Sequence, residues 1–261
     1  GDVRRTEPDL RLTAFVAATG SAGTIGAGDY LKSRHGTKIA AVEAIECPTM
    51  LVNGYGEHNI QGIGDKHIPL IHNVMNTDLV VGVSDKSSDA LNLLFNDDLG
   101  RAYLSRRQKI DPHHVRELRN IGLSGIANIV AAIKIAKRLE LGASDAIVTI
   151  ATDSAALYDS ERASYVRRRY SGGFDEVHAG EIFGQHLQGI ADDHLTELTH
   201  VDRRRVFNLG YYTWVEQQGV SVEDFDRRKD AAFWKGLQDS IPAWDKLIAD
   251  FNEDTGARVA G

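Results

Sequence analysis

Residues 12–28 read Leu12-Thr-Ala-Phe-Val-Ala-Ala18, then Thr19-Gly-Ser-Ala-Gly-Thr-Ile-Gly-Ala-Gly28. The first segment is a short apolar run that ends in turn residues, which predicts a buried strand. The small residues of the second predict a loop that opens a helix over 29–35, and Gly36 is expected to end that helix. A strand, a small-residue loop and a helix in this order are typical of an α/β fold.

The same alternation continues on the C-terminal side of this unit. Apolar runs predict further strands at 38–44, 79–83 and 145–151, and helices are expected from Ser84 as N-cap and over 124–141, where Gly142 closes the helix. Residues 45–64 form a long loop rich in Gly and Asn, a length that is typical of functional loops, and residues 105–121 are expected to be an inserted helical segment. The alternation predicts a mostly parallel sheet covered on both faces, a three-layer α/β fold.

The pattern changes after about residue 155. No convincing strand is found there, and helices are expected at 155–169, 180–190, 201–218, 222–228 and 240–252. We therefore divide the chain into an α/β domain, 1–158, and an all-helical extension, 159–261. The arginine runs 167–169 and 203–205 are interpreted as solvated helix faces. The tail is also rich in aromatic area that can pack on a partner surface, from Tyr211, Tyr212, Trp214, Trp234 and Trp244.

Composition narrows the class of protein. The 261 residues are 42% hydrophobic and 26% charged, and carry a net charge of −7, which argues against a general nucleic-acid binder. No apolar run approaches the ~20 residues that span a membrane, and the polar segment from Gly1 to Leu10 does not resemble a signal peptide. The single cysteine, Cys47, excludes an internal disulfide and is interpreted as a small loop or core residue. We expect a cytoplasmic enzyme with no membrane or nucleic-acid partner.

The loop at 19–28 has the chemistry of a phosphate site. Small residues let the backbone approach a ligand, and the free N–H groups at the start of a helix attract an anion. Ser21 and Thr24 add hydroxyl donors. The loop lacks the Gly-Lys-Ser/Thr of a P-loop, and Ala22 interrupts the dinucleotide-binding spacing. Glu43, at the end of the next strand, is a candidate ribose partner, so a dinucleotide site stays open as an alternative.

Two further segments carry candidate ligand contacts. Asn53-Gly-Tyr-Gly-Glu-His-Asn-Ile-Gln-Gly-Ile-Gly64 is flexible enough to wrap a flat ligand, and taken alone it is equally compatible with a surface turn. Thr149-Ile-Ala-Thr-Asp-Ser-Ala155 ends a strand, where ligands bind in open α/β sheets. Asp153 or Ser154 is expected either to contact a ligand there or to cap the following helix.

In order and spacing these segments resemble the O-acetylserine sulfhydrylase, or cysteine synthase, branch of the fold-type II pyridoxal-phosphate (PLP) enzymes. The resemblance covers about residues 12–158. Gly20-Ser-Ala-Gly-Thr24 matches the family's Gly-Thr-Gly-Gly-Thr with two substitutions, and the most specific match is His58-Asn-Ile-Gln-Gly-Ile-Gly64. Further matches are Asp29–Lys32, Lys38–Glu43, Val83–Asp85, Gly122–Gly125 and Asp153-Ser154. A helical tail with a stretch like Tyr212–Gly219 occurs in a longer cysteine synthase-like group.

The resemblance implies a cofactor, a site and a reaction. PLP would be held through its phosphate by Gly20, Ser21, Ala22, Gly23 and Thr24, would be lined on its other side by Gln61, Gly62, Ile63 and Gly64, and would meet Asp153 or Ser154 at its pyridine nitrogen. A serine there leaves the nitrogen unprotonated, whereas an aspartate protonates it and strengthens the electron sink. The implied reaction is β-elimination or β-replacement on a serine- or cysteine-like amino acid, and the implied assembly is a homodimer.

The chain departs from the family in its catalytic lysine. The family's Schiff-base lysine lies in an N-terminal Ser-x-Lys segment, for which there is no room before Leu12, so the resemblance implies that the N-terminal half of the domain is missing. Lys66 is interpreted as a surface lysine. The alternative to a complete enzyme is a non-catalytic phosphate-ligand-binding subunit or a degenerate homologue without that lysine.

A metal site is not expected. His178, Glu181, His186 and His194 are candidate ligands by residue type, but their spacing does not repeat a helical i, i+4 pair. His113 and His114 are expected to be exposed. No nucleophile elbow or catalytic triad is found.

Overall fold

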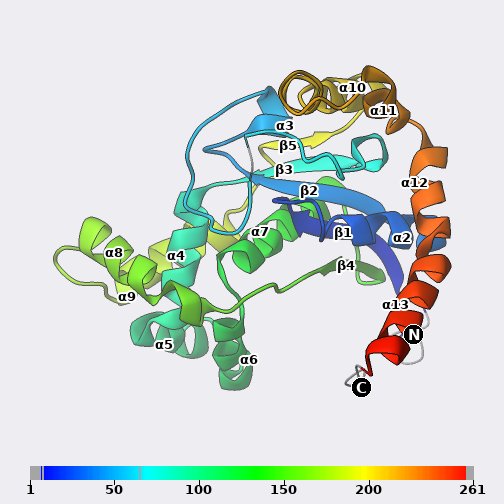
Figure 1. Cartoon of the computed structure of the whole chain (residues 1–261). Helices are drawn as coiled ribbons and strands as arrows, with labels where there is room; N and C mark the ends of the chain where they lie inside the picture. Colours follow the sequence, from blue (N-terminus) through cyan, green and yellow to red (C-terminus); the bar gives the residue numbers. More distant parts are fainter. Residues whose placement is uncertain (1–6, 8, 65, 257–261) are drawn as a thin grey trace.

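The computed structural model describes residue 7, residues 9–64 and residues 66–256, so most of the polar segment from Gly1 to Leu10 lies outside the described residues. The described residues hold a five-stranded sheet in the order β4-β1-β2-β3-β5 (Figure 1). Neighbouring strands are parallel except β5, which pairs antiparallel with β3. The strands are β1 (Arg11–Ala18), β2 (Lys38–Ala44), β3 (Leu79–Val83), β4 (Asp145–Thr149) and β5 (Leu195–Glu197).

Helices cover the sheet and continue beyond it. Those before residue 155 are α2 (Gly26–His35), α3 (Thr49–Val52), η1 (Val74–Asn76), α4 (Asp85–Asn96), α5 (Asp98–Arg106), α6 (Pro112–Glu117), η2 (Leu118–Asn120) and α7 (Leu123–Arg138). Those that follow are η3 (Ala155–Tyr158), α8 (Asp159–Arg169), α9 (Glu176–Phe183), η4 (Gly184–Gln188), α10 (His200–Asn208), η5 (Tyr212–Gln217), α11 (Val222–Arg227), α12 (Ala231–Asp239) and α13 (Ile241–Thr255).

Each face of the sheet has its own apolar core, because side chains alternate between the faces of a strand. Val16 and Val42 face α4 and α7, whereas Phe15 and Ala41 face α2 and α10. The predicted three-layer α/β fold is confirmed. Residues after 158 contribute to both cores, among them Ile182 on one face and Phe207 on the other; the boundary at residue 158 stays a prediction.

The capping residues predicted at the end of α2 and at the start of α4 are confirmed. Gly36 adopts a left-handed conformation (φ 68°) directly after α2, and the Ser84 hydroxyl accepts from the Ser87 N–H at the start of α4. The end of α7 was predicted wrongly. The helix stops at Arg138 rather than at Gly142, and Glu140 (φ 50°) adopts the left-handed conformation after it.

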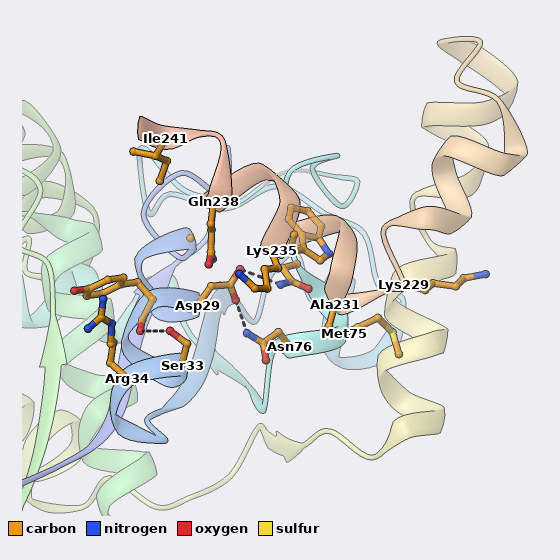
Figure 2. Close-up of a pocket in the computed structure, with 14 residues that line it drawn as sticks. Asp29, Ser33, Arg34, Met75, Asn76, Lys229, Ala231, Lys235, Gln238 and Ile241 are labelled. Atoms are coloured by element: carbon orange, nitrogen blue, oxygen red, sulfur yellow. Dashed lines mark hydrogen bonds between the residues drawn. The ribbon is translucent and has the colours of Figure 1, made fainter. Parts of the chain in front are cut away.

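The region after residue 158 is mainly helical, as predicted, but it is not all-helical. Strand β5 was missed because three residues are too few to show an alternating pattern, and its pairing with Leu79–Val81 is set by tertiary packing. Helix α12 was also missed. It lies across a groove from α2, and α13 continues from it along the side of the molecule (Figures 1 and 2).

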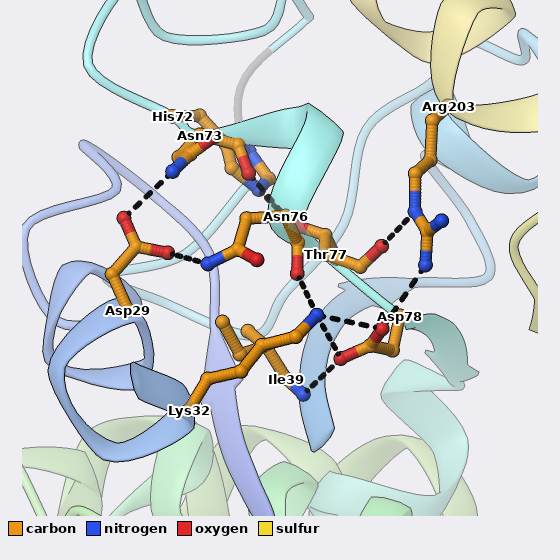
Figure 3. A network of polar contacts seen from close by, with 9 residues as sticks. All are labelled: Asp29, Lys32, Ile39, His72, Asn73, Asn76, Thr77, Asp78 and Arg203. Carbon is orange, nitrogen blue, oxygen red and sulfur yellow. Dashed lines mark hydrogen bonds and ion pairs between the residues drawn. The ribbon is translucent and has the colours of Figure 1, made fainter. Parts of the chain in front are cut away.

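The two arginine runs differ. Residues 167–169 are exposed, as the solvated interpretation requires. Arg203 is not: it donates to the Thr77 carbonyl (2.7 Å) and to the Asp78 carboxylate (3.0 Å), and so fastens α10 to the start of β3 (Figure 3). Arg205 is also half-buried and donates to the Met50 carbonyl (2.8 Å), so the interpretation of residues 203–205 as a solvated face was right only for Arg204.

The tryptophans of the tail differ in how they pack. Trp214 donates to the Ile68 carbonyl (2.7 Å) and Trp234 to the Arg228 carbonyl (2.8 Å), so both pack within the chain. Trp244 on α13 is 49% exposed. Within the described residues no single helix is long and apolar enough to cross a membrane, and Pro112–Asn120 with Leu123–Arg138 meets those criteria only as a bent pair.

Candidate active site

A small cavity of about 230 Å³ lies at the carboxyl end of the parallel strands. This edge is where open α/β sheets bind their ligands. The loop after β1, the loop before Gly64 and the segment after β4 meet there. Its lining comprises Ala18, Gly20, Ser21, Ala22, Gly23, Thr24, Gly62, Ile63, Ser124, Asn128, Thr152 and Asp153.

The loop after β1 is hydrogen-bonded to the sheet at Thr19, whereas the N–H groups further along the loop are not hydrogen-bonded within the described residues. Thr19 is buried, and both its N–H and its hydroxyl donate to the Val42 carbonyl of β2 (3.0 and 3.2 Å). By contrast, the N–H groups of residues 21–25 find no acceptor among the described residues. They precede the first turn of α2, where the helix dipole adds partial positive charge. Unpaired N–H groups of this kind, beside the Ser21 and Thr24 hydroxyls, fit a phosphate.

Ala22 stands in a conformation that favours glycine. Its φ is 68°, and its side chain is buried in the core on the α2 face. The family pattern has glycine at this position, and the left-handed conformation costs an alanine about 1 kcal/mol. The sequence showed the substitution, but the backbone angle came only from the structure.

The two predicted ligand loops touch. The Gly64 N–H donates to the Thr19 carbonyl (2.6 Å), and a Cβ placed on Gly20 would lie 3.2 Å from the Gly62 carbonyl oxygen. The structure therefore brings Gly62 and Ile63 to the phosphate loop. Gln61 and Gly64 do not line this cavity, and Gln61 points to solvent.

Asp153 and Ser154 take different places. The Asp153 side chain lines the cavity; its Oδ2 accepts from the Tyr158 hydroxyl, and its buried Oδ1 has no partner among the described residues. Burial and this carboxylate raise the pKa of Tyr158 above its ordinary value, so Tyr158 stays a donor. Ser154 is half-buried, does not line the cavity, and precedes η3 without a side-chain capping bond.

Four lining residues were not predicted: Ala18, Ser124, Asn128 and Thr152. Asn128 is buried, accepts from the Ala18 N–H (2.7 Å) and donates to the Ile150 carbonyl (3.3 Å), so it ties the ends of β1 and β4 together. Ser124 and Thr152 share a hydrogen bond (2.8 Å). One signal was available, because Ser124 and Asn128 are polar residues spaced i, i+4 on an apolar helix and therefore share a face.

Several alternatives lose support. The Glu43 carboxylate is buried and accepts from the Met50 and Leu51 N–H groups (2.8 Å each), so it is not free for a ribose. Burial raises its pKa to about 7. Lys66 is exposed, as predicted, with its Nζ 3.3 Å from the Tyr55 hydroxyl. None of the described lysines lines the cavity.

Other predictions concern single side chains. Cys47 is buried, as its interpretation as a small loop or core residue requires. The candidate metal ligands point to separate partners: His178 to Asp175 (2.9 Å) and His186 to the Ser87 hydroxyl (3.0 Å). Over the described residues no group of three or more His, Cys, Asp or Glu side chains converges. His113 and His114 are exposed.

Comparison with curated proteins finds a sequence relative. Cysteine synthase B of Campylobacter jejuni is 33% identical over 152 residues, which are 58% of this chain and 44% of the relative. Over these residues the chain is similar to cysteine synthase B. The predicted resemblance is confirmed for that part, and the chain spans less than half the length of the relative. No family model matches the chain.

Solved structures give the same kind of partial likeness. The O-acetylserine-dependent cystathionine β-synthase of Helicobacter pylori is 28% identical, with a TM-score of 0.43, and the match covers 61% of this chain and 45% of that one. A hydrogen sulfide-producing enzyme of Fusobacterium nucleatum is 22% identical, with a TM-score of 0.47, and the match covers 76% and 49%.

Proposed function

We propose that this chain supplies the phosphate side of a PLP site in an enzyme that performs β-elimination or β-replacement on a serine- or cysteine-like amino acid. The observation that carries the proposal is the row of unpaired N–H groups at residues 21–25, at the carboxyl edge of the sheet. The partial homology to cysteine synthase B supports the same cofactor. When bound, PLP supplies an electron sink for a carbanion at the substrate Cα.

The residues of this chain would bind and orient the cofactor. The N–H groups of residues 21–25 and the hydroxyls of Ser21 and Thr24 would hold the phosphate, while Gly62 and Ile63 form the wall beside it. The cavity of about 230 Å³ is smaller than the ~300–1,000 Å³ of most small-molecule sites. We infer that the rest of the site, including the lysine, comes from a part of the protein that this chain does not contain.

Between the two candidates for the pyridine nitrogen, we favour Asp153. Its Oδ1 is a buried acceptor without a donor among the described residues, and a protonated ring nitrogen is such a donor. The Tyr158 hydroxyl holds the other oxygen and so orients the carboxylate. An aspartate keeps the nitrogen protonated and strengthens the electron sink, whereas Ser154 would leave it unprotonated.

The test measures binding of PLP and of pyridoxal, which lacks the phosphate, by calorimetry. We expect PLP to bind at least tenfold more tightly, because only PLP engages the loop. Gly23→Asp places a negative charge in the loop where a Cβ meets nothing closer than 3.7 Å, so it should fold normally and weaken PLP binding about tenfold or more. Gly172→Asp, at a position with open space, is the matched control. Equal affinity for the two compounds, or an unchanged affinity in Gly23→Asp, contradicts the proposal.

The second candidate is a non-catalytic phosphate-binding subunit or degenerate homologue. It rests on the absence of a cavity-lining lysine among the described residues. Both candidate functions assume that the catalytic lysine is not in this chain. Borohydride reduction with PLP, followed by peptide mass mapping, tests that assumption. A single specifically modified lysine would show that the chain contains its own catalytic lysine, and our assignment of that lysine to another part would be wrong.

A further inference from the structure

A second and larger cavity lies outside the phosphate site. It is a groove of about 850 Å³ between α2 and α12, and Asn73, Met75 and Asn76 form its floor (Figure 2). Its volume falls within the ~300–1,000 Å³ of small-molecule sites. In Figure 2, Gln238 and Lys235 of α12 reach toward Asp29 and Ser33 of α2, so polar groups from both walls face the same space.

The walls of the groove are held before any ligand binds. The Asp29 carboxylate accepts from the side-chain amides of Asn73 (2.9 Å) and Asn76 (2.5 Å), which ties α2 to the floor (Figure 3). One turn later, Lys32 donates to the Asp78 carboxylate (2.8 Å). On the other wall, the Trp234 indole N–H donates to the Arg228 carbonyl (2.8 Å). A site with fixed walls loses little entropy when a ligand binds.

Among the described residues, Arg34 is the groove-lining cation that has no carboxylate partner. Both lysines that line the groove are paired: Lys229 with Asp226 (2.6 Å) and Lys235 with Asp239 (2.7 Å). The Arg34 guanidinium lies 5.2 Å from the centre of the Tyr30 ring, and the described residues provide it with no carboxylate. A guanidinium binds a phosphate through two parallel hydrogen bonds. Arg34 is therefore the groove residue that can bind an anionic group, while the Asp29 carboxylate in the same groove is held by the amides of Asn73 and Asn76.

Two aromatic side chains add a preference for a flat ligand. Tyr30 on α2 is 56% exposed and lines the groove from one wall, while Trp234 on α12 lines it from the other. Met75 and Ile241 complete the apolar surface. Flat rings gain free energy by stacking on exposed aromatic faces, and the Ser33 hydroxyl and the Gln238 amide can hydrogen-bond ring or sugar hydroxyls.

We propose that the groove between α2 and α12 is a second binding site, for a planar aromatic anion of the mononucleotide class. The phosphate would pair with Arg34, and the ring would lie against Tyr30 and Trp234. The site is separate from the phosphate loop: the loop lies before the first turn of α2, whereas Asp29, Tyr30, Ser33 and Arg34 lie along the flank of that helix.

The experiment titrates the chain with adenosine monophosphate, adenosine and inorganic phosphate, by calorimetry. The phosphate of the nucleotide could also enter the loop at 20–24, so variants must separate the two sites. Arg34→Ala and Tyr30→Ala change exposed side chains and should fold normally. We expect each to weaken binding of the nucleotide about tenfold or more. Arg116→Ala, an exposed arginine on α6, and the loop variant Gly23→Asp should leave the affinity within twofold.

Each outcome decides the proposal. Saturable nucleotide binding that is lost in Arg34→Ala and kept in Gly23→Asp supports it, as does weaker binding of adenosine and of phosphate alone. Absence of saturable binding at millimolar nucleotide overturns it. Binding that survives in both groove variants, or that Gly23→Asp abolishes, places the nucleotide elsewhere and overturns it as well.

Discussion

Both cavities lie beside α2, one at its start and one along its flank, but different kinds of groups line them. The cavity at the sheet edge lies before the first turn of α2 and offers backbone N–H groups, small residues and short polar side chains. The groove lies along the flank of the same helix and offers long side chains from two helices. A backbone site is altered mainly by changing glycines or the residues that hold the loop, whereas truncating one side chain should disable the groove. Changes to the residues that hold the sheet-edge cavity should therefore lower the stability of the chain, whereas truncating a groove side chain should lower ligand affinity alone.

The largest effect is expected for Gly122→Ala, a buried residue packed against Asp153 of the sheet-edge cavity. A Cβ there would lie 1.9 Å from Asp153 Oδ1 and 2.9 Å from Tyr158 Cε2, so the Asp153–Tyr158 pair must move. We expect a loss of about 3 kcal/mol in the free energy of unfolding, which is typical of overpacking at a buried site. Urea denaturation measures it. Gly142→Ala, where a Cβ meets nothing within 4 Å, is the control. Equal stability of the two variants would refute the predicted clash with Asp153 and Tyr158.

The second effect is a pH dependence at Glu43, next to the anchor of the phosphate loop. Its pKa is raised from 4.5 to about 7 in the folded chain because the carboxyl is buried. The folded state therefore holds this proton more tightly than the unfolded state, and stability falls as the pH rises from about 4.5 to about 7. The shift corresponds to about 3 kcal/mol at most.

The measurement compares wild type with Glu43→Gln, in urea, at several pH values. The wild type should lose stability relative to the variant across this window, and the difference should level off above pH 7. The exposed Glu57→Gln is the control. A difference that is constant from pH 4.5 to 8 would show that Glu43 is ionised throughout.

The strands that build the sheet-edge cavity were predictable because each is a short apolar run between turn residues, and β2 and β3 were predicted at their observed bounds. The phosphate loop was predictable because small residues follow a strand. Asn128 was missed although it and Ser124 are polar residues spaced i, i+4 on an apolar helix, because that spacing shows a shared face but not what the face meets. The groove could not be predicted at all: it exists because α12 packs across from α2, about 200 residues earlier, and such a contact leaves no periodic signal in either helix.

A smaller effect is expected at Asn128, which joins β1 to β4 beneath the cavity. Asn128→Ala removes the acceptor of the Ala18 N–H, and leaving this half-buried backbone donor unpaired costs about 1–2 kcal/mol. The matched control is Asn96→Ala, whose side chain donates only to its own helix at Asn92. Calorimetric unfolding should give a clearly lower Tm for Asn128→Ala than for the control. Equal Tm values would mean that the bond to Ala18 does not contribute to stability.

The smallest effect is expected at Ala22, whose left-handed backbone conformation shapes the phosphate loop. Ala22→Gly relieves the left-handed strain of about 1 kcal/mol, but it also removes a buried methyl group worth about 0.8 kcal/mol. The free energy of unfolding should change by less than 1 kcal/mol. Ala22→Val keeps the apolar character but places a branched side chain at φ 68°, so it should lose about 2 kcal/mol or more. If valine were tolerated as well as glycine, the loop would not hold the left-handed angle on which the row of free N–H groups depends.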